Sequence, residues 1–457
     1  MGPTSDHRPP GGAGLPRRRA MLAGAAGLAG LLGVAGCQSA PPAFDTRDEP
    51  ATGGVPELEA MLARRAAALK SKDERAFLAD LDTSNADLIA RERRLFANVT
   101  QFQFRDLHYI TAKANTVEHG GFWHVAPVIA VMRLTADAGP GGVAPGEAFQ
   151  YKLARGRGRP MIADIVPITR GNAAEVAGAV DGAFANAPWH STPLTVIQSG
   201  NVWLAGDASV PDLARYADAA RGEAAKIEAL WGSRVRFPGH VLFFTRDRKR
   251  FRAWYEVGDV DRFEGLEIPL RGVRGGGEVY GEQYAGSRIL VDLAAIEKWK
   301  DDPRHVMRHE LAHAVTARAS AVIPGVGWLD TPRWAVEGFA RWVENLEDPA
   351  RADVQRAIVA RGVRAGTFTG RPPLSKTFYG PDITFNYALG STVFSFAERL
   401  KGQEAAVELY AAVIRYSDST GTPLVEAPIF NAICRRVMDM DGEAFLARWA
   451  AHVRAGA

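Results

Sequence analysis

The sequence predicts an α+β protein with two or three domains, and three observations lead to this prediction. The chain has 457 residues, and its 47% hydrophobic and 23% charged residues are typical of a soluble globular protein. Residues 56–185 change from helical to strand periodicity, and residues 190–457 begin with short strands and continue with helices. The composition excludes a disordered chain, a collagen-like chain and a multi-span membrane protein.

The net charge gives little support to a nucleic-acid partner. It is only +3 at pH 7, and no long basic block follows the N-terminus. The two cysteines, Cys37 and Cys434, cannot form a disulfide framework and lie in no CxxC motif. We expect Cys434 to be a buried apolar residue of a C-terminal helix.

The N-terminal 37 residues have the composition of an export signal. Three arginines at 17–19 precede an uncharged run from Ala20 to Gly36 that ends in small residues. Residues 34–37 (VAGC) resemble a bacterial lipobox, which implies lipidation of Cys37. Residues 18–22 (RRAML) are similar to a twin-arginine signal, although the usual following Lys is missing. An uncleaved membrane anchor is the alternative.

Either interpretation places the rest of the chain on the outer face of the cytoplasmic membrane. Residues 38–55 would then be a flexible tether between the lipid anchor and the first domain. The oligomeric state cannot be predicted from these features.

The first domain is predicted to span residues 56–185. One long helix, with apolar residues spaced from Leu58 to Leu81, precedes strands at 102–110, 122–134, 149–153 and 161–165, with a hairpin loop at 137–142. The stretch 66–81 resembles the opening helices of NTF2-like cone domains, which implies a curved sheet around a pocket. His108, His119 and His124 are scattered, so we expect structural rather than catalytic roles for them.

The second domain is predicted to span residues 190–457. A strand–turn–strand at 194–203 is followed by a helix at 212–231, strands at 241–244 and 287–291, and then helices, the last at 443–453. Residues 301–303 (DDP) provide the start of a helix that contains the strongest chemical motif in the chain.

That motif is HELAH at residues 309–313, an HExxH sequence. His309 and His313 are four residues apart on a helix, so both imidazoles can reach one zinc ion. Glu310 lies one step around the helix, where its carboxylate can accept a proton from water activated by zinc. A packed helix without metal is the alternative.

A third ligand is needed, and Glu337 is the best candidate. It lies on a predicted helix for which Thr331 can be the N-cap and Pro332 can occupy the first turn. An antiparallel pair of helices, joined by the loop 320–330, would bring Glu337 beside the histidines. Asp330 is a weaker alternative ligand. His305 is expected to be a neighbour of the site, since a catalytic zinc keeps one position open.

The pairing of HELAH with residues 334–340 (WAVEGFA) resembles the gluzincin zinc metallopeptidases, in particular the peptidase MA-like family. The resemblance covers about residues 190–457 and implies a mostly helical zincin-like domain with a small mixed sheet. It implies His309, His313 and Glu337 as ligands of one zinc and Glu310 as general base. It also implies an oxyanion-stabilising residue from a later helix, for which we select Tyr387, with Tyr379 in reserve.

The sequence therefore predicts an exported, lipid-anchored zinc metallohydrolase, with a peptide or protein as its substrate. A non-catalytic binding lipoprotein that retains the fold is one alternative. A zinc hydrolase of a non-peptide bond is the other, because the same activated water can attack either bond.

Overall fold

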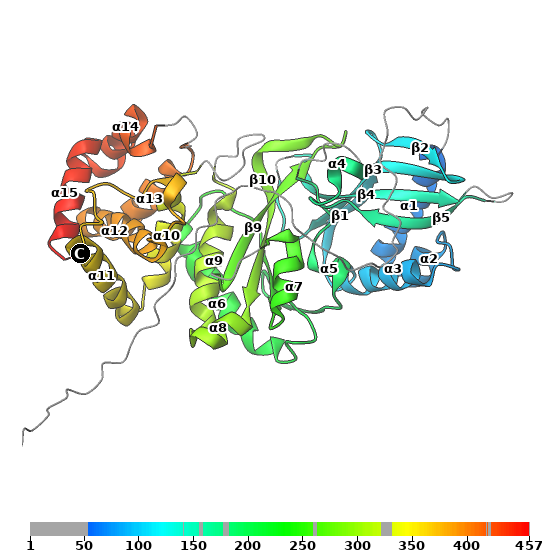
Figure 1. The fold of residues 1–457 in the computed structure, drawn as a ribbon, viewed down its shortest axis with the longest axis horizontal. Coiled ribbons are helices and arrows are strands. Elements are labelled where there is room, and N and C mark those ends of the chain that lie inside the picture. The colour runs from blue at the N-terminus through cyan, green and yellow to red at the C-terminus, as the bar shows by residue number, and fades with distance from the viewer. Residues whose placement is uncertain are drawn as a thin grey trace, which may run out of the picture.

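The structure is a computed structural model that describes residues 54–139, 141–154, 159–176, 182–258, 263–320, 331–416, 418 and 422–456. The predicted α+β class is confirmed (Figure 1). The export signal, Cys37 and nearly all of the tether lie outside the described residues. Within the described ranges, no helix is long and apolar enough to span a membrane.

The N-terminal part contains three helices, not the single long helix expected. They are α1 (Val55–Ser71), α2 (Glu74–Leu78) and α3 (Ala86–Val99). Lys72, in the left-handed conformation with φ of 56°, ends α1, and the Asp73 side chain accepts a hydrogen bond from the amide of Ala76 to start α2. The Asn85 side chain caps α3 in the same way through the amide of Leu88.

Five antiparallel strands form the N-terminal sheet. They are β1 (Phe104–Ile110), β2 (Asn115–His119), β3 (Phe122–Leu134), β4 (Ala144–Ala154) and β5 (Met161–Pro167). Four of these match predicted strands, whereas β2 was not predicted. Leu58 and Leu62 of α1 pack against Val125 and Tyr151 in one buried cluster, so α1 covers one face of this sheet. The resemblance to an NTF2-like cone stays a prediction.

A second set of five strands forms the central sheet, which is mixed, as predicted. Its members are β6 (Thr195–Ser199), β7 (Val202–Gly206), β8 (His240–Thr245), β9 (Gly265–Val273) and β10 (Val279–Asp292). The neighbours β7–β8 and β8–β10 are parallel, and β6–β7 and β9–β10 are antiparallel. The strand–turn–strand at 194–203 and the strands around 241–244 and 287–291 were predicted, but β9 was not.

The two sheets join into one ten-stranded sheet through β4 and β9. Only two residue pairs make this junction, Ala144 with Val273 and Pro145 with Gly272. Beside it, Arg288 of β10 donates to Asp137 at 2.6 Å, and both side chains are 1% exposed. The N-terminal sheet is therefore fixed to the central sheet by backbone pairing and by a buried ion pair.

Helices cover the central sheet and extend beyond it (Figure 1). Near the sheet lie α4 (Ala173–Val176), α5 (Pro188–Ser191), α6 (Ala217–Trp231), α7 (Arg248–Ala253), α8 (Leu293–Trp299) and α9 (Pro303–Ala317). The C-terminal helices are α10 (Arg333–Asn345), α11 (Pro349–Arg364), α12 (Ile383–Lys401), α13 (Gln403–Val413), α14 (Pro428–Met438) and α15 (Gly442–Arg454). The last of these matches the predicted final helix, and Cys434 is fully buried in α14, as expected.

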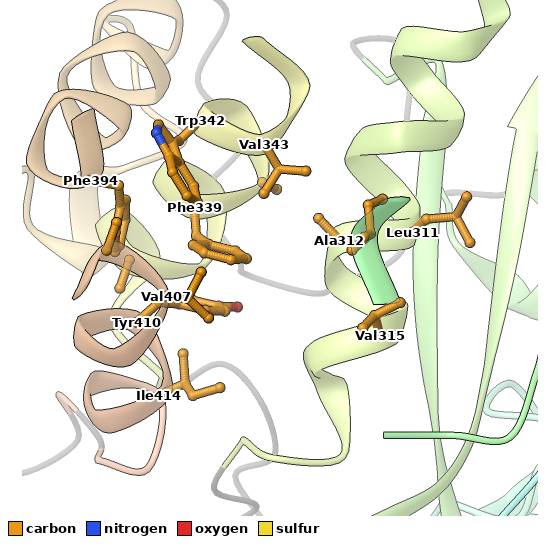
Figure 2. Packing of buried hydrophobic residues seen from close by; sticks show 14 of the residues in the cluster. Leu311, Ala312, Val315, Phe339, Trp342, Val343, Phe394, Val407, Tyr410 and Ile414 are labelled. Carbon is orange, nitrogen blue, oxygen red and sulfur yellow. The ribbon is translucent and has the colours of Figure 1, made fainter. Parts of the chain in front are cut away.

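One hydrophobic cluster runs from the central sheet through α9 into the C-terminal helices. Figure 2 shows Leu311 of α9 directed toward the sheet, with Phe339 of α10 and Tyr410 of α13 on the helical side. The rings of Phe339 and Tyr410 stack at 3.8 Å between centroids. Helix α9 is therefore held from both sides by close packing, which fixes the orientation of the residues on its remaining face.

Candidate metal centre

Helix α9 starts where the sequence predicted. Pro303 occupies its first turn, and the Asp302 side chain accepts a hydrogen bond from the amide of Arg304 at 2.9 Å. The two histidines of the motif project from the same face one turn apart, and their ring centroids are 4.9 Å apart.

Helix α10 starts differently from the prediction. Its N-cap residue is Pro332, and Thr331 makes no cap, because the amide of Arg333 instead donates to the hydroxyl of Ser375 at 3.0 Å. A side chain from a distant segment thus satisfies an amide that the sequence suggested Thr331 would satisfy. The loop before α10, including Asp330, lies outside the described residues.

Three potential ligand atoms meet between α9 and α10. The Nε2 atoms of His309 and His313 are 3.2 Å apart. Oε2 of Glu337 lies 3.5 Å from the first and 3.4 Å from the second. These three side chains form the one metal-type cluster of His, Cys, Asp and Glu found among the described residues.

The size of this triangle fits zinc. In a tetrahedral site with Zn–N and Zn–O distances of about 2.0–2.1 Å, neighbouring ligand atoms are about 3.3 Å apart. The three edges of 3.2, 3.4 and 3.5 Å therefore match three corners of one tetrahedron. The fourth corner is left for water or substrate, which is the arrangement of a catalytic rather than a structural zinc site.

A carboxylate behind His309 fixes its orientation. Nδ1 of His309 donates to Oε2 of Glu344 at 3.2 Å, which leaves Nε2 as the atom that faces the cluster. Glu344 is 2% exposed and is also bound by Arg341, at 2.6 Å, and by Arg351. Burial alone would raise the pKa of Glu344, but Arg341, His309 and Arg351 outweigh burial and bring it to about 2.

The sequence interpretation missed Glu344, although a signal existed. Glu344 is seven residues after Glu337, and two helical turns place both on the same face of α10. A carboxylate that orients a metal-binding histidine is a common partner of such sites.

Glu310 is buried against the central sheet. It is 7% exposed, and Gly265 of β9 packs on it so closely that a Cβ atom at Gly265 would lie 2.8 Å from Cγ of Glu310. Burial, reinforced by the nearby charge of Glu337, raises the pKa of Glu310 to about 7, although His309 acts in the opposite direction. Such a carboxyl group can both accept and return a proton near neutral pH.

A second carboxylate, Glu267 of β9, lies near the cluster and was not predicted. It accepts a hydrogen bond from the hydroxyl of Ser287 at 2.6 Å. Desolvation raises the pKa of Glu267 to about 7, and the charges of His313, Glu310 and Glu337 also influence it. No sequence pattern indicated a role for Glu267, because β9 itself was not predicted.

The two tyrosines considered for the site both border it. The hydroxyl of Tyr379 donates to Oε1 of Glu337 at 2.5 Å. The ring of Tyr387, on α12, lies 6.0 Å from the ring of His309 and 6.5 Å from that of Tyr379. Tyr379 therefore holds the carboxylate in place, while Tyr387 borders the cluster over His309.

His305 is not part of the cluster. Its Nδ1 lies 3.0 Å from Oδ1 of Asp301 and its Nε2 lies 3.1 Å from Oδ2 of Asp348. Both ring nitrogens are thus occupied by carboxylates at the start of α9 and before α11. The expectation that His305 is a neighbour and not a ligand agrees with these contacts.

The helices that carry Glu337 and Tyr387 touch through two glycines. A Cβ atom on Gly338 would lie 2.5 Å from the carbonyl carbon of Gly390, and a Cβ atom on Gly390 would lie 2.8 Å from the carbonyl oxygen of Trp334. Only glycine permits this separation between α10 and α12. The pair of glycines therefore sets the position of Glu337 relative to Tyr387.

Comparisons with known proteins give remote likenesses only. No known protein family and no curated protein matches the chain. An M1 zinc metallopeptidase from Deinococcus radiodurans matches with 14% identity and a TM-score of 0.33, over 56% of this chain and 50% of that one. A mutant of an M1 zinc metallopeptidase from the same organism matches with 12% identity and a TM-score of 0.35, over 76% of this chain and 94% of that one. The chain spans about half the length of the first protein, and scores this low do not assign it to that family.

Proposed function

We propose that the protein is a zinc-dependent hydrolase, and specifically a peptidase of the gluzincin type. The observation that supports this most directly is the triangle of His309 Nε2, His313 Nε2 and Glu337 Oε2, whose edges match a tetrahedral zinc site. The proposal takes residues 190–457 as a peptidase MA-like domain and residues 56–185 as an NTF2-like domain that helps to position the substrate.

In this proposal each side chain has a defined task. His309, His313 and Glu337 would hold zinc, which when bound supplies a Lewis acid that polarises a carbonyl group and acidifies water. Glu310 accepts the proton of the attacking water and then delivers it to the leaving amine. Glu344 keeps His309 in the tautomer and orientation that ligation requires.

Tyr387 is proposed to stabilise the negative charge that develops on the substrate oxygen. Tyr379 is less suited to this task because its hydroxyl already donates to Glu337. The ring of Tyr387 lies next to His309, 6.0 Å away between centroids. Tyr387→Phe should therefore lower kcat and leave zinc content unchanged.

Elemental analysis tests the metal part of the proposal. We expect about one zinc per chain after reconstitution, and a strong loss in Glu337→Ala. Glu310→Gln should keep the zinc and lose hydrolysis of peptides, because it removes the proton acceptor and none of the three ligands. A zinc-loaded protein that cleaves no peptide in a broad library would favour a binding lipoprotein or a hydrolase of another bond. Full peptidase activity in Glu310→Gln would refute the assigned role.

The location of the protein is also a proposal. The export signal and residues 34–37 (VAGC) support lipid anchoring through Cys37 on the outer face of the cytoplasmic membrane. Labelling of expressing cells with a radioactive or clickable fatty acid should modify the wild-type chain and not Cys37→Ala. Equal labelling of both chains would refute lipidation at this position.

A further inference from the structure

Arg351, in the first turn of α11, contacts two carboxylates at the ends of the helices that carry the metal ligands. Its Nη1 and Nη2 atoms donate to Oδ1 and Oδ2 of Asp301, each at 3.1 Å. Nη2 also donates to Oε1 of Glu344. Asp301 comes just before α9, and Glu344 lies in the last turn of α10. One guanidinium group therefore links the start of the histidine helix to the end of the helix that carries Glu337.

Two neighbours fix Arg351 at this position. The Asp348 side chain caps α11 and accepts a hydrogen bond from the amide of Arg351 at 3.0 Å. The other oxygen of Asp348 lies 3.1 Å from Nε2 of His305, whose Nδ1 lies 3.0 Å from Oδ1 of Asp301. Since His305 is part of α9, its imidazole bridges the starts of α9 and α11 beside the guanidinium.

The contacts of Arg351 are largely shielded from water. The side chains of Arg351, Asp301 and Glu344 are 22%, 19% and 3% exposed. Burial would raise the pKa of Asp301, but the hydrogen bonds from His305 and Arg351 outweigh burial and lower it well below its usual value. Charge-assisted hydrogen bonds are stronger than neutral ones, and a guanidinium that binds through two N–H groups fixes orientation as well as distance.

Arg341 also binds Glu344, but it does so within one helix. Its Nη1 lies 2.8 Å from Oε1 and 2.6 Å from Oε2 of Glu344, three residues further along α10. Such a contact balances the charge of the carboxylate without fixing α10 to another element. Arg351 differs from Arg341 because it holds the same carboxylate from α11 and is itself held by Asp301.

Glu344 connects Arg351 to the metal centre. Nδ1 of His309 donates to Oε2 of Glu344 at 3.2 Å, whereas Arg351 binds Oε1 of the same carboxylate. With one oxygen fixed by the guanidinium, the other faces the imidazole. Loss of Arg351 would let the carboxylate rotate and would weaken its hold on the ring of His309.

We propose that Arg351 is a positioning residue of the metal centre, which acts on His309 through Glu344. This inference rests on the proposed zinc site. Asp301 sets the place of the guanidinium, the guanidinium sets the carboxylate of Glu344, and the carboxylate sets the imidazole. Because ligand atoms of a zinc site must lie within about 0.2 Å of their ideal distances, loss of Arg351 lowers zinc affinity although every ligand remains.

A double-mutant cycle on the full-length chain tests the action through Glu344. Arg351→Met keeps most of the aliphatic volume and removes the guanidinium, and Glu344→Ala removes the carboxylate on which it acts. Zinc dissociation constants of the wild type, the two single variants and the double variant are measured by competition with a chromogenic chelator. Urea unfolding of the metal-free chains measures the stability of each variant separately.

Arg351→Met should weaken zinc binding about 10-fold in the wild-type background, the lower end of the range for outer-shell partners of metal ligands. In the Glu344→Ala background the same substitution should weaken it by less than about 2-fold, because the carboxylate on which Arg351 acts is already gone. Arg356→Met is the matched control, since Arg356 lies on the same helix and forms an exposed ion pair with Asp353. Its zinc affinity should equal that of the wild type.

Cobalt in place of zinc gives a readout that a merely structural role of Arg351 would not change. The visible absorption of tetrahedral cobalt depends on the geometry of its ligands. At saturating cobalt the bands should therefore shift or lose intensity in Arg351→Met and stay unchanged in Arg356→Met. Arg351→Lys is a second, milder variant, because an ammonium group keeps the charge but cannot meet both carboxylates as the guanidinium does. Its zinc affinity should fall by about 3-fold or more.

Equal losses of zinc affinity in the two backgrounds would overturn the action through Glu344, and so would wild-type affinity of Arg351→Met. If Arg351→Met did not fold, a wild-type zinc affinity and cobalt spectrum of Arg351→Lys would overturn the proposal in its place. These outcomes leave the proposed hydrolase intact, because the wild type still binds zinc. A wild-type chain that binds no zinc would refute the zinc hydrolase itself, and the positioning role with it.

Discussion

Replacement of Gly338 by alanine is the most direct test of how the helices position the metal ligands. The added Cβ would lie 2.5 Å from the carbonyl carbon and 2.7 Å from the carbonyl oxygen of Gly390, whereas ordinary contacts begin near 3.4 Å. Both opposing atoms belong to the backbone, so no side chain can rotate away. Helices α10 and α12 must therefore separate by about 1 Å, and overpacking of this kind costs about 1–3 kcal/mol.

Two measurements check this reasoning. The higher helix propensity of alanine offsets up to about 1 kcal/mol of this cost. The free energy of unfolding should therefore show a net fall of about 1–2 kcal/mol. Zinc affinity should fall as well, because ligand positions must hold within about 0.2 Å and Glu337 precedes Gly338. Urea unfolding of the metal-free chain and competition with a chromogenic chelator measure the two effects separately.

Gly222 provides a matched control. It lies within α6, and a Cβ atom there would meet nothing within 4 Å. Gly222→Ala should stabilise the chain by about 0.5–1 kcal/mol without any change in zinc affinity. If Gly338→Ala were as stable as the wild type and bound zinc equally well, the glycine contact could not be what sets the ligand geometry.

Three further predictions follow from contacts described above. Glu344→Ala should weaken zinc binding about 10–100-fold in a chelator competition, because the imidazole of His309 loses the carboxylate that orients it. Glu347→Ala, which removes only an exposed ion pair with a lysine, should leave zinc affinity unchanged. Equal zinc affinity of Glu344→Ala and the wild type would contradict the orienting role. Asp137→Ala should lower the free energy of unfolding by about 3–5 kcal/mol, since it leaves Arg288 buried without a counter-charge, and a loss below 1 kcal/mol in urea unfolding would disprove this. Free zinc at 100 times its Kd should stabilise the chain by about 2.7 kcal/mol, and calorimetry before and after chelation should show the corresponding change in Tm.

The sequence predicted local elements better than their assembly. The start of α9 was evident because Asp302 and Pro303 provide local capping signals. Strand β9 was missed because Pro269 and two charged residues, Glu267 and Arg271, interrupt its apolar pattern, and only its place beside β10 explains its extended conformation. The junction of β4 with β9 joins segments that are far apart in the sequence, and no local pattern encodes such a pairing.

For the candidate site, the sequence predicted the residues that share a helix or a motif. His309 and His313 are fixed by helical spacing, and the structure brings Glu337 to them as expected. The sequence alone could not predict the place of Glu267 beside the site or the hydrogen bond of Ser375 at the start of α10, because both depend on tertiary contacts. The different surroundings of Tyr379 and Tyr387 likewise became visible only in three dimensions.

The hydrophobic cluster that joins the central sheet to α9 and α10 has a consequence for how the protein acquires its metal. The histidines and Glu337 belong to elements that share one packed interior, so their separation does not depend on the ion. A chain of this kind can complete folding first and load zinc afterwards, unlike small zinc domains that are unfolded without metal. Preparations stripped by chelators should therefore remain intact on storage and regain full occupancy on simple exposure to the ion.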